Sequence, residues 1–398
     1  MTKKNIIKIT SLLFTFIIIA TGCGKSTTST LNIPKTNNSA KTDNSTKINN
    51  KTKIDSSVKI DSSVKIDNIE IQSKISKYID SYSPNDKFSG TILVAKDDKV
   101  LSDKGYGMAD YNKKIVNKPK TAFEIASLTK QFTATAILML QEKKLLNVQD
   151  TVDKYIPDYP NGDEIKIYNL LTHTSGIPDY NQSSISPVNG KHTYTLKESV
   201  NLFKNKPRHF ESGTKYEYSS SNYILLGYII EKVSGINYEE YIDKNIFKPL
   251  KLIDTGFLTY KAIIKGKANG YYRPKKTDKY TSSFDKEGSI LPSAGGIYST
   301  VDDLYTWYNA LLDGKLINKE SLNGMITPHL HSYGYGLIIT KKANGDKMIW
   351  DNGSTLGYSS YLGKDIDKRY VIIILSNKYA YNVMPIVSGL SNILEMKK

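Results

Sequence analysis

A serine and a lysine stand three residues apart at the start of a helix-period apolar segment; they are Ser127 and Lys130. Residues three apart on a helix share one face, with Cβ atoms about 5 to 6 Å apart, so the amine can reach the hydroxyl. Serine becomes a nucleophile when a base takes its proton, and a lysine kept neutral by burial is such a base. The pair therefore predicts acyl transfer, with the helix N-terminus stabilising an oxyanion. By itself the spacing is also compatible with a serine helix cap.

Five ordered segments give this pair a specific context. They are FEIASLTKQFTA (123–134), DTVDKYIP (150–157), LLTHTSGIP (170–178), GTKYEYSSSNY (213–223) and SAGGIYST (293–300). Together they resemble the serine β-lactamase and penicillin-binding-protein superfamily, closest to the branch of class C β-lactamases, D-Ala-D-Ala carboxypeptidases, D-aminopeptidases and related esterases. The resemblance implies that Ser127 is the nucleophile and that Lys130 handles its proton.

The second motif of that superfamily is Tyr-x-Asn, which falls on Tyr218, Ser219 and Ser220. By resemblance, Tyr218 shuttles protons between the nucleophile, the lysine and the leaving group. Ser220 replaces the usual asparagine, and Asn222 follows two positions later. A hydroxyl offers a substrate carbonyl one hydrogen bond, fewer than an amide can make. Both residues are therefore candidates for substrate contact.

The third motif is a Lys or His, one residue, then Gly, on a strand that edges the cleft. Its best match begins at Asp351 and includes Gly353, followed by Ser354, so an acid stands where relatives carry a cation. By resemblance, the backbone amides of Ser354 and Ser127 form the oxyanion hole, and main-chain donors do not depend on the side chain at 351. The acid is expected to repel the carboxylate of a β-lactam or of a D-Ala-D-Ala terminus.

The carboxylate of Asp351 has two interpretations. It can bind a substrate ammonium group, such as that of D-alanine esterified to a teichoic acid, or of a D-amino-acid amide. It can instead pair within the fold with Lys130 or with an arginine such as Arg208 or Arg273. The sequence leaves both open.

Other candidate residues favour structural roles. His173 is expected to be a hydrogen-bonded structural residue. His329 and His331 lie two apart without an acidic cluster, so no metal site is predicted. No cofactor is implied, and no phosphate-binding loop or nucleic-acid motif is found.

Sequence periodicity predicts a fold that agrees with the resemblance. Strands are expected at 88–95 and 100–106 as a hairpin, and again at 335–340, 358–362 and 370–376. Helices are expected after Phe123 and at 222–233, 238–246, 301–312 and 383–396. This α+β arrangement is a serine β-lactamase-like fold with an antiparallel sheet flanked by helices (about 69–125 and 290–398) and a mostly helical subdomain (about 126–289).

The N-terminus reads as an export signal. Lysines precede an apolar run at 9–20, and Ala20, Thr21 and Gly22 lead into Cys23, the single cysteine of the chain. This pattern resembles a bacterial lipoprotein signal over residues 1–22, with Cys23 lipidated; an exported protein with a free thiol is the alternative. Lipidation predicts anchoring at the outer face of the cytoplasmic membrane. Residues 23–68 are rich in Ser, Thr, Asn, Lys and Asp and are expected to form a flexible tether ahead of a 69–398 hydrolase domain.

Composition predicts a globular protein with an anionic partner. The 398 residues are 39% hydrophobic and carry a net charge of +16. Such a charge suits nucleic acid, acidic lipid or a polyanionic wall polymer. The leading prediction is a serine acyl hydrolase acting on a D-amino-acid ester or peptide of the cell envelope, with cell-wall peptide or a teichoic-acid-like polymer as partner. The alternatives are a penicillin-binding carboxypeptidase or class C-like β-lactamase, and an inactive envelope-binding or sensor protein.

Overall fold

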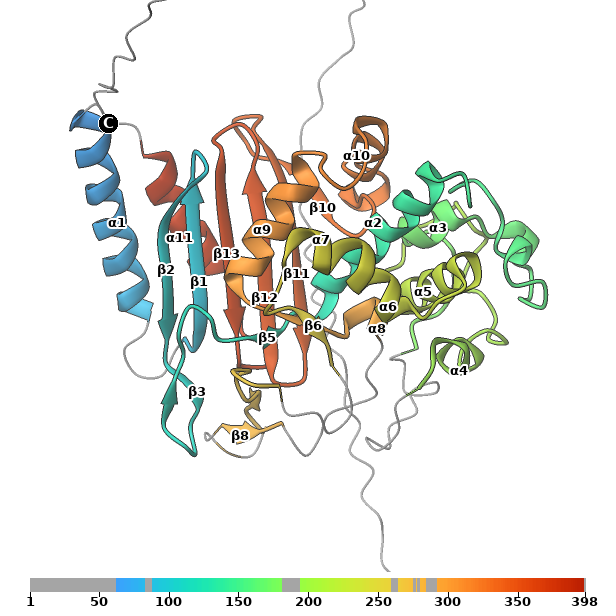
Figure 1. The fold of residues 1–398 in the computed structure, drawn as a ribbon, viewed down its shortest axis with the longest axis horizontal. Helices are drawn as coiled ribbons and strands as arrows, with labels where there is room; N and C mark the ends of the chain where they lie inside the picture. Colours follow the sequence, from blue (N-terminus) through green and yellow to red (C-terminus); the bar gives the residue numbers. More distant parts are fainter. Residues whose placement is uncertain are drawn as a thin grey trace, which may run out of the picture. The chain divides into compact units, whose positions relative to one another are not determined.

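A computed structural model describes residues 62–82, 88–180, 194–258, 264–274, 277, 280–283 and 292–396. It combines an antiparallel sheet, helices that cover both faces of that sheet, and a helical subdomain (Figure 1). The expected signal peptide, Cys23 and the tether up to residue 61 lie outside the described residues. Across the described ranges, none of the helices combines the length and the apolar character that a membrane crossing requires.

The main sheet joins strands from both ends of the described chain. Its order is β10-β11-β12-β13-β1-β2, and neighbouring strands are antiparallel. The strands are β1 (Gly90–Lys96), β2 (Lys99–Tyr106), β10 (Ile338–Lys341), β11 (Lys347–Thr355), β12 (Tyr358–Asp365) and β13 (Tyr370–Ser376). The expected N-terminal hairpin is confirmed, and its turn uses Asp97 and Asp98 at positive φ, a conformation that Asp tolerates.

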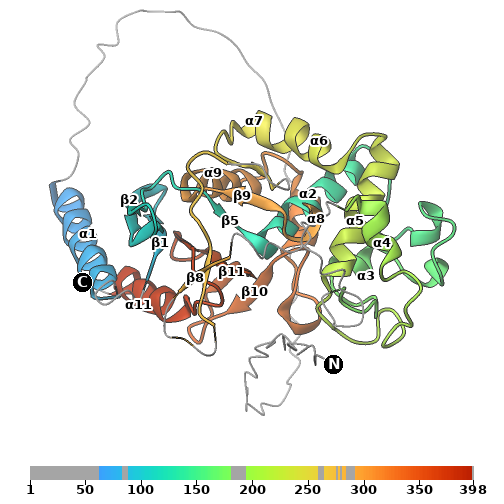
Figure 2. The same cartoon turned by 90° about the horizontal axis from the view of Figure 1, so that it is seen from below.

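Both faces of the central strands are buried. On β1, Ile92 and Val94 pack with α1 (Ser62–Tyr82) and α11 (Met384–Glu395). Leu93 and Ala95 point to the opposite face and join the core that includes α9 (Val301–Leu312). Figure 2 shows α1 beside α11, on the other side of the strands from α9. Burial on two sides explains the unbroken apolar sequence of these strands.

The helix α1 begins at Ser62, so its backbone includes residues 62–68 that composition assigned to the tether. The correction has a physical cause. Ile75 and Ile79 stand four residues apart, are fully buried and pack in the core cluster that contains α11. Between them, the Tyr78 hydroxyl donates a hydrogen bond to the carbonyl of Pro385, 2.9 Å away. This packing begins after residue 68, so a composition average over residues 23–68 does not include it.

The helical subdomain is centred on α2 (Thr129–Glu142), α5 (Ser220–Ser234) and α8 (Pro292–Gly295), which contact one another. Around them lie α3 (Ile167–Leu171), α4 (Leu196–Asn201), α6 (Tyr238–Ile242) and α7 (Lys248–Leu250). The Phe132 ring of α2 stacks on Trp307 of α9, with centroids 3.9 Å apart. This aromatic contact fixes the subdomain against the helix that covers the sheet.

The remaining elements are short. They are β3 (Met108–Asp110), β4 (Ile115–Val116), β5 (Phe123–Glu124), β6 (Gly256–Phe257), β7 (Tyr271–Tyr272), β8 (Thr281–Ser282), β9 (Ile297–Ser299), α10 (Lys319–Met325), the 3₁₀ turns η1 (Ala126–Leu128), η2 (Val152–Lys154), η3 (Gly162–Glu164) and η6 (Leu330–Ser332), and the π-helical turn η4 (Asp243–Phe247). Two element boundaries differ from those that the sequence predicted. The strand expected from 335 begins at Ile338, because Gly336 turns the chain at φ 75°. The helix expected over 238–246 passes into η4 after Ile242.

Candidate active site

Ser127 lies in η1, the turn that leads from β5 into α2. The turn is held from two sides. Ile125 donates its amide hydrogen to Ile297 at 3.0 Å, and its carbonyl accepts a hydrogen bond from the Ser360 hydroxyl at 2.8 Å. Ala126 adopts φ 48°, an uncommon conformation for a residue with a Cβ. Ser127 is partly exposed between buried Ala126 and Leu128, so a strained, anchored turn presents its hydroxyl.

Lys130 reaches Ser127 as the three-residue spacing predicts. Its fully buried amine donates hydrogen bonds to Ser127 Oγ at 3.2 Å and to the carbonyl of Ala294 at 2.7 Å. No ion pair among the described residues includes it. Burial lowers its pKa to about 8, although the charges of Asp351 and Asp179 act in the opposite direction. At neutral pH the amine is mostly protonated, but a neutral fraction is available to act as a base.

Tyr218 completes the group, immediately before α5. Its hydroxyl donates to Ser127 Oγ at 2.8 Å, and the Lys130 amine lies 5.1 Å from its ring centroid. Burial, and then the charge of Asp351, raise the pKa of Tyr218 well above its usual value. The phenol therefore keeps its proton, and the Ser127 oxygen receives hydrogen bonds from two donors.

His173 supports this arrangement from behind. Its Nδ1 accepts hydrogen bonds from the Ser219 amide and the Asn222 side chain, each at 3.2 Å. Its ring centroid lies 4.3 Å from that of Tyr218. Burial, and then the charge of Lys130, hold the pKa of His173 well below its usual value. The residue is a neutral, hydrogen-bonded wall of the site, as the sequence suggested.

The two candidates for substrate contact near the second motif, Ser220 and Asn222, make different contacts. Ser220 is the first residue of α5, and its amide donates to Asp179 Oδ2 at 3.1 Å. Asn222 is fully buried, and its Oδ1 accepts from the Ser175 hydroxyl at 2.6 Å while its amide nitrogen bonds His173. The structure thus engages both polar ends of Asn222 within the fold, outside the group of Ser127, Lys130 and Tyr218.

The third motif lies on an open edge of β11. β10 pairs with β11 only as far as Trp350, and the following residues of β11 contact η1. A Cβ at Gly353 would lie 2.5 Å from the carbonyl oxygen of Ile125 and 2.9 Å from the Ser127 amide nitrogen. Glycine is therefore required for this close approach. Ser354 follows on the exposed side of the strand.

Asp351 shares a strand face with Gly353 and is only 4% exposed. Its Oδ1 accepts a hydrogen bond from the Asn352 amide at 2.8 Å, whereas its buried Oδ2 has no hydrogen-bond partner. No ion pair among the described residues includes this carboxylate. Arg208 pairs with Glu164, and Arg273 lies over Tyr280. The alternative of pairing within the fold is therefore not seen among the described residues, and burial raises the pKa of Asp351 to about 7.

Aromatic rings gather near Lys130. Tyr333 lies 4.7 Å from the His173 ring centroid and 6.3 Å from that of Tyr218. Tyr216 lies 6.0 Å from Tyr333 and 4.9 Å from His331. Burial first, and the charge of Asp351 among the further causes, raises the pKa of both tyrosines. Tyrosines scattered along the sequence gave no sign that these two meet beside Asp351.

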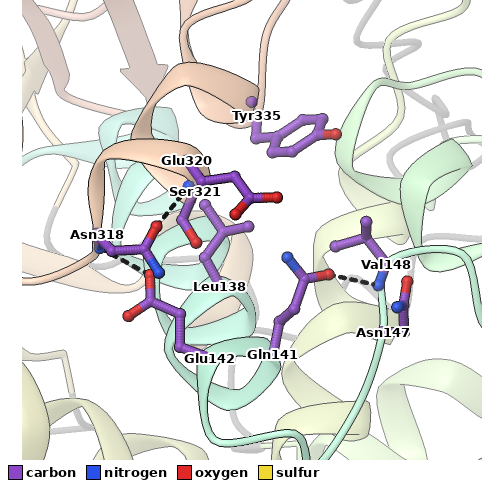
Figure 3. A pocket seen from close by; sticks show the side chains of 10 residues that line it. Leu138, Gln141, Glu142, Asn147, Val148, Asn318, Glu320, Ser321 and Tyr335 are labelled. Carbon is purple, nitrogen blue, oxygen red and sulfur yellow. Dashed lines mark hydrogen bonds between the residues drawn. The ribbon is translucent and has the colours of Figure 1, made fainter.

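A separate pocket of about 500 Å³ lies between α2, α10 and the loop at 147–148 (Figure 3). Its polar groups bond one another. Glu142 accepts from the Asn318 amide at 2.8 Å, and Gln141 accepts from the Val148 amide at 2.9 Å. None of the catalytic candidates lines it, so the pocket stands apart from Ser127.

Metal ligands do not gather in the described residues. No three His, Cys, Asp or Glu side chains there come close enough to hold an ion. His329 bonds the Tyr168 hydroxyl at 3.1 Å, while His331 packs on Tyr216. These two histidines are thus parts of separate aromatic contacts.

Comparison with known proteins agrees with the geometry. The family model described as Beta-lactamase matches residues 76–386. The PbpX protein of Bacillus subtilis (strain 168) is 33% identical over 310 residues, which cover 78% of this chain and 74% of that protein. The chain therefore belongs to the beta-lactamase family.

Solved structures show the same fold. A penicillin-binding protein from Bacillus halodurans superposes with a TM-score of 0.72 at 27% identity, covering 79% of this chain and 99% of that one. A D-stereospecific amidohydrolase from a Streptomyces species superposes with a TM-score of 0.67 at 25% identity, covering 81% and 98%. The expected serine β-lactamase-like arrangement is confirmed.

Proposed function

We propose that the protein is a serine acyl hydrolase that works through an acyl-enzyme on Ser127. One observation carries the proposal: a single hydroxyl lies within hydrogen-bond distance of both a buried lysine amine and a tyrosine hydroxyl. Membership in the beta-lactamase family supports the same chemistry. A nucleophile beside a base, with both held by packing, is the arrangement that such chemistry needs.

The groups suit a two-step reaction. The Ser127 oxygen attacks the substrate carbonyl carbon as the Lys130 amine takes the hydroxyl proton, and the amides of Ser127 and Ser354 hydrogen-bond the oxyanion. Collapse expels the leaving group, which takes a proton from Tyr218, and the Lys130 ammonium returns a proton to the phenolate. Water then attacks the ester carbonyl, the acid departs, and the hydroxyl of Ser127 is restored.

Electrostatics support this division of roles. Burial lowers the pKa of Lys130 to about 8, so the amine can accept a proton. Tyr218 has its pKa raised well above the usual value by burial and by Asp351, so the phenol is the better donor. Lys130 is therefore the base of acylation, and Tyr218 is the acid.

For the substrate we propose a D-amino-acid ester or peptide of the cell envelope. The relative from Streptomyces is named as a D-stereospecific amidohydrolase. The lipoprotein-like signal over residues 1–22, which precedes Cys23, supports a position at the outer face of the cytoplasmic membrane. The net charge of +16 favours a polyanionic wall polymer, such as a teichoic acid, as the carrier of the ester.

A penicillin-binding carboxypeptidase or class C-like β-lactamase is the second candidate. The name of the Bacillus halodurans structure favours it. The position of Asp351 disfavours it, because a buried acid beside Lys130 repels a substrate carboxylate. An inactive binding protein is disfavoured by the contacts that Lys130 and Tyr218 make with Ser127.

Labelling with a fluorophosphonate tests the proposal. The full-length protein and its Ser127→Ala variant are each treated with the reagent, and their intact masses are measured. We expect one adduct on the unmodified protein and none on the variant. An unlabelled protein that retains its fold by circular dichroism would favour the binding protein instead.

A further inference from the structure

We propose that Asp351 and the tyrosines beside it form a subsite for the α-ammonium group of the acyl donor. This inference rests on the proposed acylation of Ser127, and it specifies that the substrate carries a positive charge. It selects donors with a free amino group, such as D-alanyl esters and amides. Donors whose recognition depends on a carboxylate are rejected.

The first support is an unsatisfied acid. Asp351 is 4% exposed, and its Oδ2 accepts no hydrogen bond from the described residues. A buried, unpaired polar oxygen costs free energy, and a cationic ligand that donates to it removes the cost. The nearby lysine does not do so, since Lys130 donates to Ser127 and to the carbonyl of Ala294.

The second support is the surroundings of the acid. The Tyr333 ring centroid lies 6.0 Å from that of Tyr216 and 6.3 Å from that of Tyr218, and the charge of Asp351 contributes to the raised pKa of all three tyrosines. Tyrosine rings and hydroxyl oxygens are favourable neighbours for an ammonium group, through cation–π attraction and hydrogen bonding. Asp179 adds a second negative charge near Lys130. Both acids make the site attractive to cations within a strongly basic protein.

The third support is spacing. Asp351 and Gly353 lie on one face of β11, about 7 Å apart along the strand. A Cβ at Gly353 would lie 2.9 Å from the Ser127 amide nitrogen, where the substrate oxygen would be held. In an α-amino ester the ammonium nitrogen lies about 3 Å from the carbonyl oxygen. A charge-assisted hydrogen bond adds about 2.8 Å, for a total of about 6 Å, which is close to the separation of the two residues along the strand.

A matched pair of substrates tests the subsite. D-alanine methyl ester and D-lactate methyl ester differ only in an ammonium group against a hydroxyl. For the full-length protein, kcat/KM is measured for both, and the ratio of the two values is compared among the unmodified protein, Asp351→Asn and Asp179→Asn. The ratio within one variant removes any general effect of the substitution on Lys130. The Asp179 variant is the matched acid, because its carboxylate already bonds the Ser220 amide.

We expect the unmodified protein to prefer the D-alanine ester at least tenfold. Asp351→Asn should bring the ratio to about one, whereas Asp179→Asn should retain most of the preference. A ratio near one in the unmodified protein, or a ratio that Asp351→Asn leaves unchanged, would overturn the subsite. A preference lost in Asp179→Asn alone would place recognition on the other acid and would also overturn it.

A binding measurement keeps the subsite testable apart from catalysis. The Ser127→Ala variant is titrated with D-alaninamide and with D-lactamide by calorimetry. At least tenfold tighter binding of D-alaninamide than of D-lactamide would support the subsite. If no ester were hydrolysed, the proposed function would fail, but this binding preference would still support the subsite. Equal affinities would overturn the subsite even where Ser127-dependent hydrolysis is found.

Discussion

The nucleophile turn and the edge of β11 lie against each other but satisfy their polar groups differently. At the turn, the Ser127 oxygen receives hydrogen bonds from Lys130 and Tyr218, and Lys130 also bonds the fold. At the strand edge, one oxygen of Asp351 is buried without a partner. On the helical side the reacting oxygen and the lysine amine are both hydrogen-bonded, whereas on the strand side a carboxylate oxygen is not. We infer that the first side performs the chemistry and the second selects the substrate.

Removing the nucleophile should have the largest effect. Ser127→Ala is expected to lower ester hydrolysis by at least about 10⁴-fold, because the remaining donors cannot form the acyl-enzyme. Steady-state hydrolysis of D-alanine methyl ester measures it, and thermal unfolding near that of the unmodified protein is the control. Retained turnover would move the nucleophile elsewhere.

Removing the base should have the next largest effect. Lys130→Met keeps an apolar side chain of similar length at this buried position and is expected to lower kcat by about 10²- to 10⁴-fold, the usual contribution of general-base catalysis. Single-turnover mass spectrometry should show slow appearance of the acyl-enzyme. Acylation at the original rate would contradict the assigned role of the lysine.

Tyr218→Phe should lower kcat by less, and it also changes the helical side of the site. The ring that packs on His173 remains, and only the hydroxyl that donates to Ser127 is lost. We expect kcat to fall about 10- to 100-fold for poor leaving groups, which need a proton, and less for p-nitrophenyl esters. Equal losses for both kinds of ester would remove Tyr218 from the role of acid.

On the strand side, the smallest effect concerns stability. Burial raises the pKa of Asp351 from 3.8 to about 7, so between these values the folded protein holds a proton that the unfolded chain releases. Stability is therefore lost as pH rises through this window. Asp351→Asn should unfold at higher urea than the unmodified protein at pH 8, by roughly 2 kcal/mol, and at a similar concentration at pH 4. A less stable variant at pH 8 would show that the carboxylate is paired.

Local patterns in the sequence predicted the helical side well. The Ser127 to Lys130 spacing fixes two side chains on one helical turn, and the surrounding motif supplied Tyr218. The β1–β2 hairpin and α9 also followed from periodicity, because each buries its apolar residues in a regular pattern.

Contacts between residues far apart in the sequence could not be predicted from such local patterns. That Asp351 is unpaired depends on where Lys130 and Arg208 point, and this is decided by packing. The sequence ranked Asn222 beside Ser220, but two positions on a helix turn a side chain to another face, toward His173. Tyr216 and Tyr333 meet only through tertiary contact.

The most direct test examines both sides of the site in one experiment: the reactivity of Ser127 and the selection by Asp351. The full-length protein and Ser127→Ala are mixed separately with a fluorophosphonate and with a penicillin, and the intact masses of protein and drug are recorded. We predict a Ser127-dependent fluorophosphonate adduct, with both protein and drug unmodified in the penicillin mixture. A stable Ser127-dependent penicillin adduct, or a drug that gains one water, would contradict selection by Asp351 and would favour a penicillin-binding enzyme.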